Sequence, residues 1–359
     1  MPVSILYDTP ENMEAMLKYL QAKHYPVEEL EMGEEPEGQL ISPVDYASLF
    51  IQWGNKLKAI APGIRMGGPG FATLAFTEQD VTTFSEGKWT GIFLNYLQKH
   101  NSIDLFNFFT FEWYPFDDIC APTAPQLAIA PQMLSIALKD IQEHVLAKNI
   151  PVYLTEYGYS AFSGKAEVEI EGALMYADIL GKFITMGGGK SFLYGYEPAY
   201  LETEGCSWGN NILFGLDDNG KIKYRTAAYY GMQMLTHFWL QPVNSHVEIY
   251  PTSCDIENKQ KQPLITAYAC RNAAGKWSLM LINKDPKKSW NVTVDIENMT
   301  LHTSVKFQPV QSIQYSRQQY RWVNNGNKGH PSLNHPPVIK NSKQPGTVSL
   351  PPYSLTVLN

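Results

Sequence analysis

Apolar positions follow two alternating periods from the start of the chain to about residue 240. Short apolar runs that suit buried strands are each followed by a segment whose apolar residues recur every three or four positions, as in an amphipathic helix. Six strand-like runs lie at about residues 3–7, 27–32, 64–68, 103–111, 151–154 and 191–196. This alternation predicts βα units around a parallel sheet.

Local signals mark where several of the helices begin and end. Thr9 before Pro10, and Ser42 before Pro43, place a capping hydroxyl ahead of a proline at the first helical position. Further helices are predicted at about residues 89–97, 132–146, 173–184 and 226–238. The triple glycine at 187–189 ends the third of these four helices.

The pattern changes beyond residue 240, where no helical period remains. Runs at 265–270 and 277–282 flank the turn signal at 272–275, which predicts a β-hairpin. Further strands are predicted at 290–296, 348–350 and 355–358, with a polar loop at about 324–344. We therefore predict an α/β domain over residues 1–240 and an all-β sandwich domain over residues 241–359.

Composition and charge narrow the functional classes. The 359 residues suit two domains, and a formal net charge of −7 without a long Lys/Arg run argues against nucleic acid or an anionic membrane as a partner. No run approaches the roughly 18 apolar residues of a membrane-spanning helix. The first residues lack the layout of a signal peptide, and the localisation and oligomeric state stay open.

The four cysteines have no zinc-motif spacing, and no arrangement of His, Cys and carboxylates requires a metal or another cofactor. Cys254 and Cys270 lie in the predicted β domain and could pair. Free thiols are the favoured state for all four cysteines, because their density is low.

Two glutamates at the ends of strands carry the strongest chemical signal. Glu156 follows the apolar run 151–154, and Glu35 follows the strand predicted at 27–32. In a parallel α/β barrel the carboxyl ends of the strands meet at one mouth. Two carboxyl groups about 5–5.5 Å apart are what a retaining glycosidase needs, one as nucleophile and the other as general acid and base.

Several runs resemble those of clan A glycoside hydrolases with a C-terminal β-sandwich, such as β-xylosidases, arabinofuranosidases and β-glucuronidases. These runs are EMGEEP at 31–36, GGP at 67–69, FEWYP at 111–115, TEYG at 155–158 and LPPYSLTVL at 350–358. The resemblance implies a (β/α)8 TIM barrel and hydrolysis of an O-glycosidic bond with retention. It also implies Glu156 as the nucleophile on the seventh strand and Glu35 as the acid/base on the fourth.

The sequence departs from that pattern in two places. Glu34 stands where those families carry an asparagine that contacts the sugar 2-hydroxyl, and Glu34 also competes with Glu35 for the acid/base role. Only six βα units are present, so the barrel lacks its first two units and keeps its third to eighth strands.

The remaining candidate residues each have a structural alternative. Tyr114 is expected to donate a hydrogen bond to Glu156, and Trp113, Tyr196 and Glu197 are expected with Glu34 to bind a saccharide or glycoside substrate. Core packing is the alternative for the three aromatic residues, and exposure at the barrel rim is the alternative for Glu197.

The acidic run at 28–37 could also be a solvated face. The rival functions are a non-catalytic carbohydrate-binding protein and an inactive fragment of a glycosidase. The sugar and the linkage stay open.

Overall fold

A computed structural model describes residues 1–72, 86–144, 146, 149–208, 212–240, 246–341 and 347–359. The contacts divide it into two compact units. The first comprises Met1–Tyr114, Ser135–Tyr157 and Met186–Phe192, and the second comprises Pro115–Leu134, Gly158–Thr185 and Leu193–Asn359. The predicted domain boundary at residue 240 stays a prediction, and residues 241–245 lie outside the described part of the chain.

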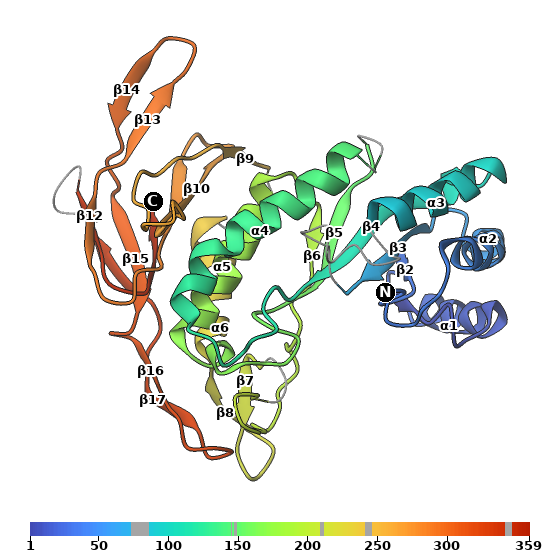
Figure 1. Cartoon of the computed structure of the whole chain (residues 1–359), viewed down its shortest axis with the longest axis horizontal. Helices are drawn as coiled ribbons and strands as arrows, with labels where there is room; N and C mark the ends of the chain where they lie inside the picture. Colours follow the sequence, from blue (N-terminus) through green and yellow to red (C-terminus); the bar gives the residue numbers. More distant parts are fainter. Residues whose placement is uncertain (73–85, 145, 147–148, 209–211, 241–245, 342–346) are drawn as a thin grey trace. The chain divides into compact units, whose positions relative to one another are not determined.

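The first unit is built on one parallel sheet of six strands. These are β1 (Pro2–Val3), β2 (Glu29–Met32), β3 (Arg65–Phe71), β4 (Phe106–Trp113), β5 (Val152–Tyr157) and β6 (Lys190–Ser191). Each strand pairs in parallel with the next along the chain. The predicted number and parallel order of the six strands are therefore confirmed, and together the strands form a curled half-barrel (Figure 1).

Helices follow these strands where the capping signals predict them. Helix α1 (Pro10–Ala22) begins after Thr9, and α2 (Pro43–Ile60) begins after Ser42; each hydroxyl accepts a hydrogen bond from a backbone N–H of the first turn. Helix α3 spans Glu86–Lys99. Helix α4 (Thr123–His144) begins nine residues before the predicted start, and it contains Pro131. Figure 1 shows α1, α2 and α3 on the same side of strands β2–β4.

The outermost strands are shorter than predicted. β1 ends at Val3, because residues 5–7 form a turn in which the Tyr7 N–H donates to the Ser4 carbonyl. β6 ends at Ser191, and Gly195, with φ of 84°, has a left-handed backbone that cannot belong to an extended strand. The prediction of one strand from 191 to 196 is therefore wrong.

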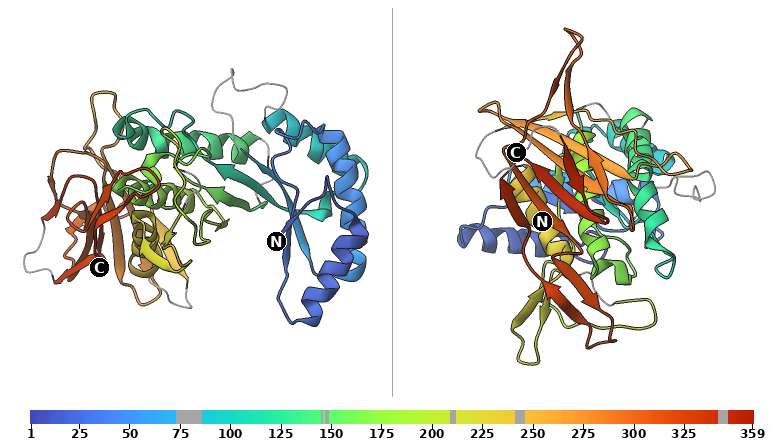
Figure 2. Two further views of the ribbon diagram at one scale, coloured as in Figure 1. Left: turned by 90° about the horizontal axis from the view of Figure 1, so that it is seen from below. Right: turned by 90° about the vertical axis from the view of Figure 1, so that its left-hand side faces the viewer.

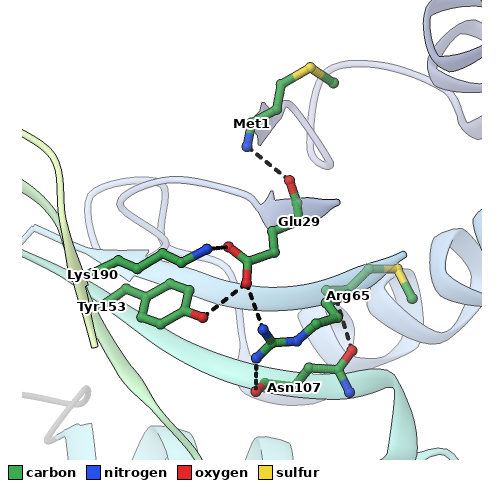
Figure 3. Close-up of polar contacts among 7 residues, drawn as sticks. Met1, Glu29, Arg65, Asn107, Tyr153 and Lys190 are labelled. Atoms are coloured by element: carbon green, nitrogen blue, oxygen red, sulfur yellow. Dashed lines mark hydrogen bonds and ion pairs between the residues drawn. The ribbon is translucent and has the colours of Figure 1, made fainter. Parts of the chain in front are cut away.

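A polar network joins the amino-terminal ends of the strands (Figure 3). The carboxylate of Glu29 on β2 accepts hydrogen bonds from Arg65 on β3 (2.7 Å), Tyr153 on β5 (2.9 Å) and Lys190 on β6 (2.6 Å). The backbone carbonyl of Glu29 accepts from the amino group of Met1 at 2.9 Å. Because β2 and β6 are four positions apart in the sheet, their direct contact requires strong curvature.

The second unit combines helices with antiparallel sheets. It contains the first part of α4, up to Leu134, and the helices α5 (Ile170–Thr185) and α6 (Ala227–Gln233), and a π-helical turn at Met234–Trp239 follows α6. Its main sheet has the order β18-β15-β20-β11-β10-β9, and Figure 2 shows its strands in orange to red. The bounds are β9 (Val247–Tyr250), β10 (Ile265–Asn272), β11 (Trp277–Asn283), β15 (Gln311–Ser316), β18 (Val338–Asn341) and β20 (Ser354–Leu358).

Four two-stranded sheets accompany the main sheet in the described part of the chain. They pair β7 (Phe214–Leu216) with β8 (Ile222–Arg225), β12 (Trp290–Val292) with β19 (Val348–Leu350), β13 (Asp295–Asn298) with β14 (Thr303–Lys306), and β16 (Tyr320–Val323) with β17 (His330–Asn334). The hairpin predicted around residues 272–275 is confirmed, since β10 and β11 pair there. The loop predicted at 324–344 is wrong in part, because it contains β17 and β18.

The cysteine prediction is also wrong in part. Cys120 and Cys206 form a disulfide, although they are 86 residues apart in the sequence. Cys254 and Cys270 are free thiols.

A buried ion pair lies between α5 and the main sheet of the second unit. The Lys284 ammonium lies 3.1 Å from the Asp178 carboxylate, and both side chains are almost completely buried. Thr266 and Tyr268 on β10 also donate hydrogen bonds to Asp178. None of the described helices is long and apolar enough to cross a membrane.

Candidate functional site

Three strands of the first unit bring glutamates together at their carboxyl ends. β2 ends at Met32, and Glu34 and Glu35 follow it within three residues. Glu112 is the penultimate residue of β4, and Glu156 is the penultimate residue of β5. Glu112 and Glu156 are register partners on neighbouring strands, so their side chains leave the sheet side by side.

The loop after β2 has the conformation that this arrangement needs. Gly33 has φ of 105° and Glu35 has φ of 44°, so both lie in the left-handed region. The Glu35 N–H donates to the Gly70 carbonyl at 2.7 Å. Gly70 itself has φ of 69°, and a Cβ there would lie 3.1 Å from Oε1 of Glu31, so a larger residue would strain the loop and crowd the site.

Glu34, Glu112 and Glu156 form the centre of the site. One carboxylate oxygen from each of them lies within 4.8 Å of the other two. Glu34 is exposed, Glu156 is half-buried and Glu112 is buried. The structure therefore brings together Glu156 and Glu34 from the predicted residues and adds Glu112 to them.

Glu156 accepts a side-chain hydrogen bond from a tyrosine. The Tyr114 hydroxyl donates a hydrogen bond of 2.9 Å to Oε2 of Glu156, as the sequence predicts. Burial raises the pKa of Glu156, the Tyr114 hydrogen bond opposes this rise, and the charges of Glu34, Glu35 and Glu31 add to it.

Glu112 has the most perturbed pKa of the group. Burial, together with the negative charges of Glu156, Glu35, Glu34 and Glu31, raises its pKa to about 10. Glu112 is therefore a neutral acid at pH 7, able to donate a hydrogen bond.

Glu35 lies at the same mouth, where its charge acts on both Glu112 and Glu156. Partial burial and the neighbouring charge of Glu34 raise the pKa of Glu35. A carboxyl group that keeps its proton to higher pH is suited to general acid catalysis.

The other predicted residues are not gathered at this centre by any described contact. The Trp113 side chain is buried and packs edge-on against Phe111, which agrees with the core alternative. Tyr196 is 70% exposed and packs edge-on against Phe214. Tyr196 and the exposed Glu197 belong to the second unit.

Sequence reasoning gave too little weight to Glu112 and Glu31. The sequence alone places Glu112 in the run FEWYP at 111–115, at the end of a predicted strand. Glu31 lies on β2, three residues before Glu34, and burial raises the pKa of Glu31 too. For Glu31 the sequence offers one signal. Glu29 and Glu31 are two residues apart on β2, so they lie on the same face of that strand.

The three central carboxylates are also spaced so that they could hold a hard divalent cation, which prefers oxygen ligands. The neutral state of Glu112 disfavours this use, because a metal ligand must be deprotonated.

A scan of the sequence against models of protein families finds no match, and a comparison with curated proteins finds none either. Solved structures do match. The GH51 arabinofuranosidase from Xanthomonas axonopodis pv. citri matches with a TM-score of 0.65 and 14% identity, over 99% of this chain and 74% of that one. The GH family 44 endoglucanase Cel44A from Clostridium thermocellum matches with a TM-score of 0.62 and 14% identity, over 100% of this chain and 73% of that one.

A monomeric beta-xylosidase from Caulobacter crescentus CB15 matches with a TM-score of 0.54 and 12% identity, over 97% of this chain and 73% of that one. The fold is similar to that of clan A glycoside hydrolases. The resemblance stated from the sequence motifs is thereby confirmed at the level of fold. In this glycosidase-like fold, the carboxyl ends of the parallel strands are where a barrel enzyme carries its active site.

Proposed function

We propose that the protein is a retaining glycoside hydrolase whose active site is the glutamate cluster at the carboxyl ends of β2, β4 and β5. The observation that supports this proposal most strongly is that Glu156 and Glu34 have carboxylate oxygens within 4.8 Å of each other. Glu35 is adjacent to Glu34 in the sequence. The Glu34–Glu156 spacing fits the short carboxyl separation of retaining enzymes better than the longer one of inverting enzymes, and it keeps Glu34 as the competitor of Glu35 for the acid/base role. The similar fold of known glycosidases supports the same reading.

In this proposal Glu156 attacks the anomeric carbon while the bond to the leaving oxygen breaks. Glu35 donates its proton to that oxygen. Water then attacks the anomeric carbon of the glycosyl-enzyme, releases Glu156 and gives a proton to Glu35. Tyr114 orients Glu156 and favours its ionised form through their hydrogen bond.

We also propose that the half-barrel represents the third to eighth strands of a (β/α)8 barrel, and that the antiparallel sheets beyond residue 240 form a β-sandwich. The six parallel strands in sequential order support the first point. Trp113, Tyr196 and Glu197 stay candidate substrate contacts, with the alternatives given above.

The test is a release assay on aryl glycosides. The panel follows the solved structures of similar fold: an arabinofuranosidase, a beta-xylosidase, an endoglucanase and a xyloglucanase. It therefore contains aryl α-L-arabinofuranosides, β-D-xylosides and β-D-glucosides. Incubation with matching 2-deoxy-2-fluoro glycosyl fluorides, followed by peptide mass mapping, should place the glycosyl group on Glu156.

Two substitutions separate the roles of the adjacent glutamates. Glu35→Gln should slow substrates with poor leaving groups far more than substrates with dinitrophenolate, which leaves without a proton. Glu34→Gln should slow both kinds alike. The reverse pattern would move the acid/base role to Glu34.

A non-catalytic carbohydrate-binding protein is the second candidate. Glu34 favours it, because it stands where the similar families carry an asparagine that contacts the sugar 2-hydroxyl. Carbohydrate binding without turnover of any panel substrate, and without labelling of Glu156, would decide for this candidate.

A further inference from the structure

The glutamate cluster gathers more carboxyl groups than the two that the hydrolytic mechanism requires. Five carboxyl groups contribute to it: Glu31, Glu34, Glu35, Glu112 and Glu156. In the described part of the chain, no lysine, arginine or histidine forms an ion pair with Glu34, Glu35, Glu112 or Glu156. The main charges that act on Glu35, Glu112 and Glu156 come from other glutamates.

Glu112 gives a second, independent indication of a ligand. The residue is only 4% exposed, and none of the hydrogen bonds or ion pairs among the described residues involves its carboxyl group. One of its oxygens nevertheless lies within 4.8 Å of oxygens from Glu34 and Glu156. A carboxyl group of a largely buried residue needs a hydrogen-bond partner, and beside Glu34 and Glu156 that partner is left to a ligand or to solvent.

The cations of the same sheet are committed elsewhere. Arg65 and Lys190 both pair with Glu29 at the amino-terminal ends of the strands. The chain therefore leaves the positive charge at the carboxyl ends to be provided by a ligand.

We propose that the substrate carries an ammonium group beside the scissile bond, as in a glycoside of a 2-amino-2-deoxy sugar. This inference rests on the proposed function, and it names the substrate class of the same site. Atoms no more than 4.8 Å apart leave a point within about 2.8 Å of all three, which is the length of a charge-assisted N–H···O bond. An ammonium group has three protons to donate, and an oxygen of Glu34, an oxygen of Glu156 and the carbonyl oxygen of the protonated Glu112 can each accept one.

The position of the amino group follows from the proposed chemistry. Glu156 bonds to the anomeric carbon, which has two ring neighbours. One neighbour is the ring oxygen, which carries no substituent. The other is C2, so a charged substituent close to both Glu156 and Glu34 belongs on C2. Neutral sugars and uronic acids would leave the cluster uncompensated, and a uronate would add repulsion.

The experiment measures binding and turnover separately. Binding is measured by calorimetry on Glu35→Gln, which keeps all three central carboxyl groups. The ligands are methyl glycosides of gluco and galacto configuration carrying an amino, acetamido or hydroxyl group at C2. The acetamido sugars are the matched control, because acetylation removes the charge and keeps the nitrogen. We expect the amino glycoside of one configuration to bind at least about tenfold more tightly than its two counterparts.

A second comparison tests the residues. Glu34→Gln, introduced into the same background, should abolish the preference for the amino sugar. Glu28→Gln removes an equal charge from an exposed residue just before β2, and it should leave the preference unchanged. Circular dichroism and melting of each variant show whether it folds.

Each result has one meaning. Equal or weaker binding of every amino glycoside overturns the inference, and so does a cluster that binds Ca²⁺, Mg²⁺, Mn²⁺ or Zn²⁺ without preferring amino sugars. Turnover of 2-hydroxy aryl glycosides alone would keep the proposed function and overturn the inference. Preferential binding of amino glycosides without turnover by the wild-type protein would uphold the inference and overturn the hydrolase.

Discussion

The two ends of the parallel sheet use the same residue type in opposite ways. At the amino-terminal ends, Glu29 accepts hydrogen bonds from Arg65, Lys190 and Tyr153 (Figure 3). At the carboxyl ends, Glu112 and Glu156 meet Glu34 with Tyr114 as the donor to Glu156. The contacts at one end lower the pKa of a glutamate, and burial with like charges at the other end raises it.

This difference indicates that the glutamate at the amino-terminal ends stabilises the sheet, whereas the glutamates at the carboxyl ends serve a functional site. A carboxylate that accepts from two cations and a tyrosine fixes the strands to one another. Carboxyl groups gathered without cations destabilise the folded state, since burial and like charges disfavour their ionised forms. Such strain persists where it serves a site, which supports a catalytic role for the carboxyl ends.

The largest expected effect comes from the nucleophile. We expect Glu156→Gln to lower kcat/KM by a factor on the order of 10³ or more, because the amide cannot form the glycosyl-enzyme. The melting temperature should not fall, since the substitution removes one of several crowded carboxyl groups. Stopped release assays and calorimetry measure the two quantities, and an active Glu156→Gln variant would contradict the assignment.

Glu29→Gln should act on stability instead. The half-exposed Arg65 and Lys190 lose their shared carboxylate, so we expect the free energy of unfolding to fall by about 1–2 kcal/mol. Urea unfolding measures this loss. Glu11→Gln is the matched control, because it removes an exposed partner of Lys56 and should cost little.

The stabilisation by Glu29 should depend on pH in a defined direction. Burial acts to raise its pKa, but Lys190, Tyr153 and Arg65 together lower it. A carboxyl group with a lowered folded-state pKa contributes stability above its unfolded pKa, and this contribution is lost as the pH falls through the folded value. The difference in stability between wild type and Glu29→Gln should therefore shrink below about pH 4. A difference that is constant down to pH 2 would contradict the ion-pair account.

Tyr114→Phe tests the hydrogen bond within the site. Loss of this donor should lower kcat/KM by roughly tenfold and raise the pKa of Glu156. The acidic limb of the pH profile of kcat/KM should move to higher pH. An unchanged limb would show that the Tyr114 hydroxyl does not act on Glu156 in solution.

Glu34→Gln should have the smallest effect on the pH profile, and in the opposite direction. The charge of Glu34 raises the pKa of both Glu156 and Glu35. Removing that charge should lower both values, so both limbs of the profile should move to lower pH. A shift of either limb to higher pH would contradict the proposed roles.

The parts of the fold that could be predicted from the sequence are those that depend on residues adjacent in the sequence. Thr9 and Ser42 identify helix starts because capping is local. Gly195 interrupts the predicted strand before Tyr196 because its backbone is left-handed. The sequence alone does not tell whether a single glycine is extended or left-handed. The Cys120–Cys206 pair joins positions 86 residues apart, and such a pair is set by the three-dimensional fold.

The candidate site was predictable to the same degree. Glu156 and Tyr114 could be paired because their motifs end adjacent predicted strands. The protonation of Glu112 could not be predicted from its motif. Its pKa depends on burial and on the charges of glutamates on β5, on β2 and in the loop after β2.

Azide rescue tests most directly the claim that the carboxyl ends of the strands carry the chemistry. With an activated aryl glycoside, Glu156→Ala should regain turnover in azide and form a glycosyl azide whose anomeric configuration is opposite to that of the substrate. Glu35→Ala should give the azide of unchanged configuration, because Glu156 still forms the glycosyl-enzyme. An azide product of unchanged configuration from Glu156→Ala, or a fully active Glu156→Ala variant without azide, would contradict the account.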